Sequence, residues 1–97
     1  HVDPEDDEVI ARPTHLPSRP KIAALLQQSC QDLPGFNALQ WLNCHYLDLH
    51  ITLSIAIPLS ALDDMPAQAL TKLYQDRLYS QLDKTTLHLY FYRDENA

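Results

Sequence analysis

A chain of 97 residues supports one small domain and no second one. Its 13 acidic and 7 basic residues give a formal charge of −6, which argues against nucleic acid and anionic membrane surfaces as partners. The single glycine excludes glycine-rich phosphate loops and dinucleotide fingerprints, and no apolar run reaches the roughly 20 residues of a membrane-spanning helix. Two cysteines are too few for a disulfide framework, which favours a reducing, cytoplasmic compartment.

Residues 1–16 differ in composition from the rest of the chain. Five acidic residues lie within Asp3–Glu8 and Arg12 is the only base, so this segment has a net charge of −4. We therefore expect an acidic flexible tail over residues 1–16 and a folded domain over residues 17–97. The alternative is a cation-collecting arm that also uses His1 and His15, although the spacing matches no defined metal loop. A first residue other than methionine is compatible with an excised or trimmed piece of a longer protein.

The folded part opens with a predicted helix. Ser18 suits the N-cap position, and Pro20 is tolerated in the first turn. Apolar or small residues then recur at three- and four-residue spacing, as on one face of a helix, and they include Ile22, Leu25, Leu26, Ser29, Cys30 and Leu33. Pro34 and Gly35 end this helix. Cys30 lies on the apolar face, so we interpret it as a core residue and not as a reactive thiol.

Two strands are predicted next. The first covers Asn37 to Cys44. The second, from Leu47 to Ile57, alternates apolar and polar residues over eleven positions, which predicts one buried face and one polar face. Pro58 ends this strand because it cannot donate a ladder hydrogen bond. Neighbouring side chains on a strand point to opposite faces, so Cys44 and His45 make a weak candidate for a ligand pair.

A second helix and a third strand complete the domain. Asp63 and Asp64 offer an N-cap for a helix from about Met65 to Leu82. After residues 83–84 a closing strand alternates again, with Leu87, Leu89 and Phe91 on one face and His88, Tyr90 and Tyr92 on the other. No internal repeat is present.

This order of elements predicts an α+β fold, a ferredoxin-like αββαβ two-layer sandwich. Its three-stranded mixed sheet carries both helices on one face, and the β-α-β crossover is right-handed. The other face then presents a polar but aromatic surface, with Asp48, His50, Thr52 and Ser54 beside His88, Tyr90 and Tyr92. Since such a face commonly meets its own copy, we expect a C2 homodimer.

The element order and several local segments resemble the cytosolic C-terminal domain of the cation diffusion facilitator (cation efflux) family. The segments LPGF (33–36), HITLSIAI (50–57) and TLHLYFYRDE (86–95) are similar to the family's turn, second strand and closing strand. The resemblance covers about residues 17–95. It implies a dimerisation and regulatory domain of a divalent cation (zinc-type) efflux transporter, or a stand-alone relative. In a fragment, the partner would be the transmembrane portion of an inner-membrane protein.

The usual metal ligands of that family do not carry over to this chain. The histidine of the second strand matches Ser54, and the closing His-x-Asp matches Tyr90 and Tyr92. The alanine-histidine pair of the second helix matches Ala67 and Gln68. Only Asp94 can stand for a family ligand, after a shift of two residues. The resemblance therefore implies a divergent member with altered or absent metal sites.

The residues themselves offer a different metal site. His50 and His88 lie on the outward face by strand parity, and with Asp48 or Asp94 they could bind zinc or a similar divalent cation across a dimer interface. The alternative is that both histidines are solvated or hydrogen-bonded on an amphipathic sheet. No arrangement of nucleophile, base and orienting group is recognisable, so we expect no enzyme activity. A small protein-interaction or scaffolding domain without metal is the alternative function.

Overall fold

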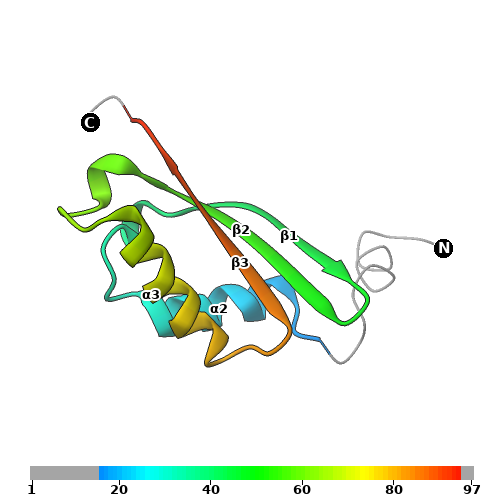
Figure 1. Cartoon of the computed structure of the whole chain (residues 1–97). Coiled ribbons are helices and arrows are strands. Elements are labelled where there is room, and N and C mark those ends of the chain that lie inside the picture. The colour runs from blue at the N-terminus through cyan, green and yellow to red at the C-terminus, as the bar shows by residue number, and fades with distance from the viewer. Residues whose placement is uncertain (1–15, 95–97) are drawn as a thin grey trace.

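The computed structural model describes residues 16–94, and the predicted α+β fold is confirmed. Two helices, α2 (Arg19–Cys30) and α3 (Ala67–Tyr79), pack on one face of a three-stranded sheet (Figure 1). The strands are β1 (Gln40–Leu47), β2 (His50–Pro58) and β3 (Thr85–Tyr92), and they form a ferredoxin-like two-layer sandwich. Two short 3₁₀ helices cover Phe36–Ala38 and Leu59–Ala61. Of the predicted tail, only Leu16 is described, and it packs against the core.

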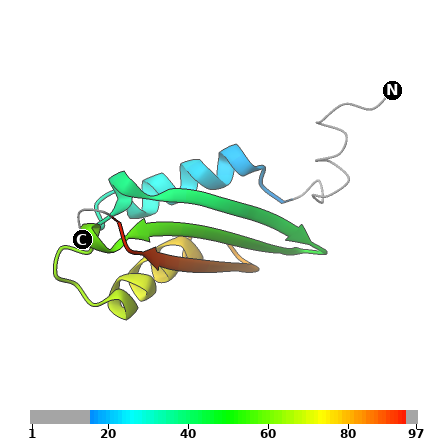
Figure 2. The ribbon, with the colours of Figure 1, turned by 90° about the horizontal axis from the view of Figure 1, so that it is seen from above.

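The sheet has the order β1-β2-β3, with β1 antiparallel and β3 parallel to β2 (Figure 2). The central strand β2 supplies Ile51, Leu53, Ile55 and Ile57 to the core, and none of the four is exposed to solvent. Core side chains from the other elements are Ile22, Leu26, Cys30, Leu33, Cys44, Leu70, Tyr74, Leu78, Leu82 and Leu87. The period-two pattern therefore assigned the buried face of β2 and β3 correctly.

The predicted boundary between the first two strands was wrong. A two-residue turn at Asp48 and Leu49 divides the alternating stretch 47–57, so β1 ends at Leu47 and β2 begins at His50. Asp48 has a φ of 54°, a left-handed conformation that aspartate tolerates better than most residues in turns. The turn was not predicted because Leu47, Leu49 and Ile51 continue the alternation of apolar and polar residues through it. Leu47, expected in the core, pairs with His50 and is 73% exposed.

Both helices are shorter than their sequence patterns indicated. α2 begins after Ser18, as predicted, but ends at Cys30, before Leu33. α3 begins after Pro66, whereas Asp63 and Asp64 lie in the preceding loop with φ values of 55° and 64°. These aspartates therefore form the turn that leads to α3 and do not cap it. Apolar residues beyond the helix ends still join the core, which is why their spacing resembled further helical turns.

Candidate functional site

The sheet face opposite the helices carries the sequence-predicted site. Strand register assigns side chains to this face, because directly paired residues share a face. We call it the open face, and it comprises Gln40, Asn43, His45, Leu47, His50, Thr52, Ser54, Ala56, Pro58, Thr86, His88, Tyr90 and Tyr92. None of these residues is Asp, Glu, Lys or Arg. The open face is thus polar and aromatic without a carboxylate, an ammonium or a guanidinium.

The centre of the open face is shielded by its own edges. Ser54 and Ala56 on β2 are each only 6% exposed, although no helix covers them. Ser54 lies between Asn43 and His88, and Ala56 lies next to Tyr90, which is 52% exposed. The low exposure of these two residues leaves the larger side chains of the flanking strands as the accessible part of this region. Ser54, the position that the family resemblance associated with a histidine ligand, is therefore buried.

The two predicted histidine ligands lie on the same face but far apart. His88 is paired with Ser54, which is four residues along β2 from His50. At about 3.3 Å per residue this separates the two histidines by roughly 13 Å along the sheet. His50 Nε2 forms a 2.7 Å hydrogen bond with Thr86 Oγ1, and the His88 ring lies 6.4 Å from that of Tyr90. One ion cannot bind both histidines of a single protomer, because zinc–nitrogen bonds are only about 2 Å long.

The two predicted carboxylate ligands lie at opposite ends of the sheet. Asp48 forms the hairpin turn between β1 and β2. Asp94 follows the far end of β3, where its Oδ2 accepts a 2.5 Å hydrogen bond from the Ser60 hydroxyl. Within residues 16–94 no group of three or more His, Cys, Asp or Glu side chains is positioned to hold a metal ion. The four predicted ligands are therefore not brought together within one protomer.

A third histidine on the open face was missed. His45 on β1 pairs with Thr52, so it is a diagonal neighbour of His50, with Cα atoms about 7–8 Å apart. Its parity could have shown this, but the predicted strand ended one residue earlier, at Cys44. Cys44 points to the opposite, helix-covered face and is buried. Cys44 and His45 thus do not form a ligand pair.

The buried titratable groups belong to the core. Cys30 is fully buried on α2, and desolvation raises the pKa of its thiol to about 11. Its Sγ lies 3.9 Å from the carbonyl oxygen of Tyr74. Burial also raises the pKa of the Tyr74 phenol, whose hydroxyl donates a 2.9 Å hydrogen bond to the carbonyl of Pro34. Both side chains are held protonated at neutral pH, and their observed contacts are structural.

Comparisons with protein-family models, with curated proteins and with solved structures found no match to this chain. Among residues 16–94, neither helix has the length and apolar character needed to cross a membrane.

Proposed function

We propose that this chain is a homodimerisation domain that associates through the open face. The observation that carries the proposal is the composition of this face, which has three histidines and two tyrosines but no Asp, Glu, Lys or Arg. The buried centres of protein interfaces are depleted of charged residues and enriched in tyrosine. Tyr90 and the three histidines of this face are accessible while Ser54 and Ala56 are buried, and a two-fold arrangement would pair this face with its own copy.

The finer proposal is the regulatory domain of a divalent cation efflux transporter, or a stand-alone relative. In this proposal a zinc-type ion bridges the two protomers and favours one dimer arrangement. The separation of His50 and His88 supports ligands from both copies, because the described residues of one protomer form no group of three or more potential ligands. The histidine pair of His45 and His50 adds donors near the hairpin end of the same face.

The metal-free interaction domain remains the second candidate function. It is favoured by the 2.7 Å hydrogen bond between His50 and Thr86, which already satisfies one nitrogen of that imidazole. It requires only the uncharged aromatic surface and no ion. Both candidates share the dimer, so oligomeric state and metal affinity are tested separately.

Light scattering across a concentration series tests the dimer. The expected mass is twice the 11.1 kDa of one chain. Tyr90→Lys places a charge on the proposed interface at a 52% exposed position next to Ala56, so the mass should fall to that of a monomer. Gln28→Lys adds the same charge to the exposed surface of α2 and should leave the dimer intact. A monomeric wild-type chain at high concentration contradicts the proposal.

Calorimetric titration of the dialysed protein with zinc tests the ion. The regulatory-domain proposal predicts saturable binding at one or two ions per dimer. The double variant His50→Ala, His88→Ala should weaken that binding about tenfold or more, as expected for loss of ligands from a site of few donors. The double variant Gln27→Ala, Gln28→Ala, on the exposed surface of α2, is the control. If the histidine double variant binds zinc as tightly as the wild type, these histidines are not ligands. If the wild-type dimer is stable but binds no zinc, the metal-free domain is supported.

A further inference from the structure

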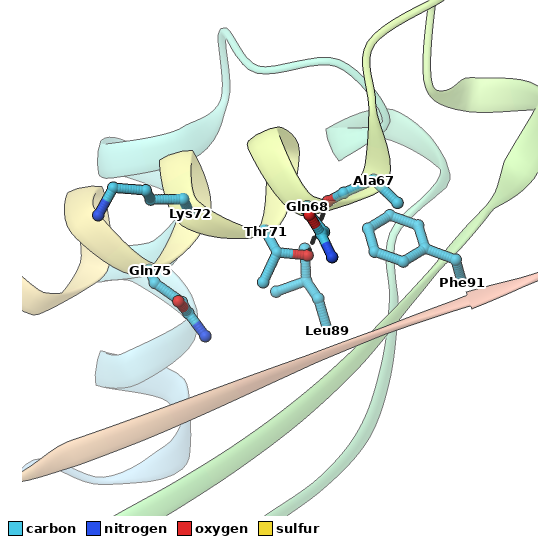
Figure 3. A pocket seen from close by; sticks show the side chains of 7 residues that line it. All are labelled: Ala67, Gln68, Thr71, Lys72, Gln75, Leu89 and Phe91. Carbon is cyan, nitrogen blue, oxygen red and sulfur yellow. Dashed lines mark hydrogen bonds between the residues drawn. The ribbon is translucent and has the colours of Figure 1, made fainter.

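A groove lies between helix α3 and strand β3, away from the open face (Figure 3). It has a volume of about 440 Å³. Leu89 and Phe91 point from β3 toward the helix and form its apolar part. The helix contributes Ala67, Gln68, Thr71, Lys72 and Gln75. The groove is therefore amphipathic, with two apolar side chains from the sheet and mostly polar ones from the helix.

The strand that borders this groove is an edge strand of the described sheet, because in residues 16–94 β3 pairs with β2 and with no other strand. Backbone groups of alternate residues in a strand point to opposite sides. The carbonyl of Lys84 accepts a 2.9 Å hydrogen bond from the Ile51 N–H, so even-numbered residues of this segment face β2. Odd-numbered residues, namely Leu87, Leu89 and Phe91, direct their N–H and C=O groups to the free edge.

Helix α3 covers only the first part of that edge. The Leu87 N–H donates a 2.9 Å hydrogen bond to the Tyr79 hydroxyl, and the Leu87 carbonyl accepts a 3.0 Å hydrogen bond from Gln75 Nε2. No side chain among residues 16–94 makes a corresponding hydrogen bond to Leu89 or Phe91. As far as residues 16–94 show, two residues of strand edge are thus unpaired directly beside the groove that their own side chains line. Such edges pair readily with an added strand.

The charge near the groove favours an acidic occupant. Lys72 is the only charged residue of the groove lining, and the exposed Arg93 follows β3 at its end. Lys72 forms a 3.8 Å ion pair with Asp76, but both side chains are largely exposed, so the amine can turn to another carboxylate at little cost. Residues 16–94 carry 7 acidic and 6 basic side chains, a net charge of −1. The charge of −6 on the whole chain repels an acidic peptide at long range, and salt at about 0.15 M, with a Debye length of about 8 Å, screens this repulsion while the contact with Lys72 is short-range.

We propose that β3 accepts an extended acidic peptide of a partner protein as a fourth strand at Leu89–Phe91. Backbone hydrogen bonds to the free edge provide affinity, and alternate apolar side chains of the peptide enter the groove. Carboxylates on the peptide meet Lys72 and Arg93. This surface is separate from the open face, so dimerisation and peptide binding can occur in the same molecule.

Fluorescence anisotropy with the full chain tests the proposal. The probe is a fluorescein-labelled peptide of alternating valine and glutamate, and its matched control alternates valine and lysine. Saturable binding of the glutamate probe, several-fold tighter than that of the lysine probe, is expected. Absence of saturable binding, or equal binding of the two probes, overturns the proposal. Binding that converts dimers into monomers would assign this edge to a second copy and would also overturn it.

Backbone methylation of the probe distinguishes strand addition from contact through side chains alone. In an antiparallel arrangement with valines facing the groove, the valine N–H groups bond to Leu89 and Phe91, whereas in a parallel arrangement the glutamate N–H groups do. Methylating one set should weaken binding about tenfold, since two hydrogen bonds are lost, and methylating the other set should have little effect. Equal effects of the two methylations overturn strand addition.

Charge reversal on the protein tests the same groove from the other side. Lys72→Glu should weaken binding of the glutamate probe by about threefold or more and favour the lysine probe, because the substituted side chain lies at the groove. Lys21→Glu changes the net charge equally but lies on the exposed surface of α2, so it should leave the discrimination between the probes unchanged. An equal effect of both variants overturns the assignment to this groove.

Discussion

Gly35 connects α2 to the sheet in a conformation that side chains disfavour. Its φ is +82°, and a Cβ added there would lie 2.6 Å from Ile57 Cγ2, on a side chain that is itself fully buried. Gly35→Ala should therefore combine left-handed strain with overpacking and lower the free energy of unfolding by about 1–3 kcal/mol. Urea unfolding measures this, with Asn37→Ala on the exposed surface of the same loop as the control. Equal unfolding midpoints for the wild type and Gly35→Ala would contradict the packing described here.

Cys30 should be nearly unreactive in the native protein. Because burial raises its pKa to about 11, only roughly one thiol in a thousand is ionised at pH 8, and the sulfur is also inaccessible. Iodoacetamide alkylation followed by peptide mass spectrometry should show slow modification of Cys30 in buffer and rapid modification in urea. The unfolded chain is the internal control. Similar rates of Cys30 alkylation in buffer and in urea would mean that α2 readily separates from the core. That result would contradict the burial of Cys30.

An ion pair links Asp32, which follows α2, to Arg77 in the last turn of α3. Arg77 Nη1 donates a 2.8 Å hydrogen bond to Asp32 Oδ1 and a 3.0 Å hydrogen bond to the Ser29 carbonyl. The hydrogen bond from Arg77 lowers the pKa of the Asp32 carboxyl. Because the native pKa of Asp32 lies below its unfolded-state pKa of about 4, the ion pair stabilises the folded protein above that pH. This stabilisation is lost progressively as the pH falls below about 4 toward the native pKa.

Asp32→Asn should therefore lower the melting temperature slightly at pH 7 and by less at pH 3, below the unfolded pKa of this carboxyl. The pair is largely exposed, so the effect at pH 7 is small. Thermal unfolding of the wild type and the variant at both pH values measures the difference. Asp83→Asn, in the loop before β3, controls for the loss of one negative charge. A difference between Asp32→Asn and the wild type that is as large at pH 3 as at pH 7 would show that the variant acts by a route other than this ion pair.

Period-two alternation was sufficient to predict the faces of the strands and insufficient to predict their ends. It placed Ile51 and Leu87 in the core and His88 outside, because parity depends only on adjacent residues. The turn at Asp48 was missed because apolar residues continue at the same period on both of its sides. Helix spacing had the same limit: Leu82 is buried, but it follows the end of α3.

The candidate site was less predictable than the fold because it depends on register between strands. Which residue of β3 lies beside Ser54 is decided by backbone pairing across the β-α-β crossover, which no local pattern encodes. The sequence therefore placed His50 and His88 on one face but could not show their separation. The free part of the β3 edge could not be predicted for the same reason. Tyr79 and Gln75 form hydrogen bonds with the Leu87 backbone only once α3 is packed against β3.

At the scale of the whole molecule, charge is distributed unevenly along the chain. Residues 1–15 contain five acidic residues and one basic residue, so they hold −4 of the total charge of −6. Two copies that associate through the uncharged open face bring these segments into one particle. Like charges on associating partners raise the dissociation constant at low ionic strength, and salt screens the effect.

Deleting residues 1–15 should consequently strengthen the proposed dimer at low salt. The deletion leaves each chain with a charge of −2, and the core residues all lie after this segment. Sedimentation equilibrium should give a several-fold lower dissociation constant at about 0.01 M salt, where the Debye length is about 30 Å, and no difference at about 1 M, where it is about 3 Å.

A full-length variant in which the five acidic residues of this segment are replaced by their amides separates charge from length. It should match the deletion at both salt concentrations, because the effect depends on charge alone. If the deletion weakens the dimer, or if its effect persists at high salt while the amide variant has none, the segment contributes contacts of its own. The dimer interface would then extend beyond the open face, and Tyr90→Lys should no longer abolish association completely.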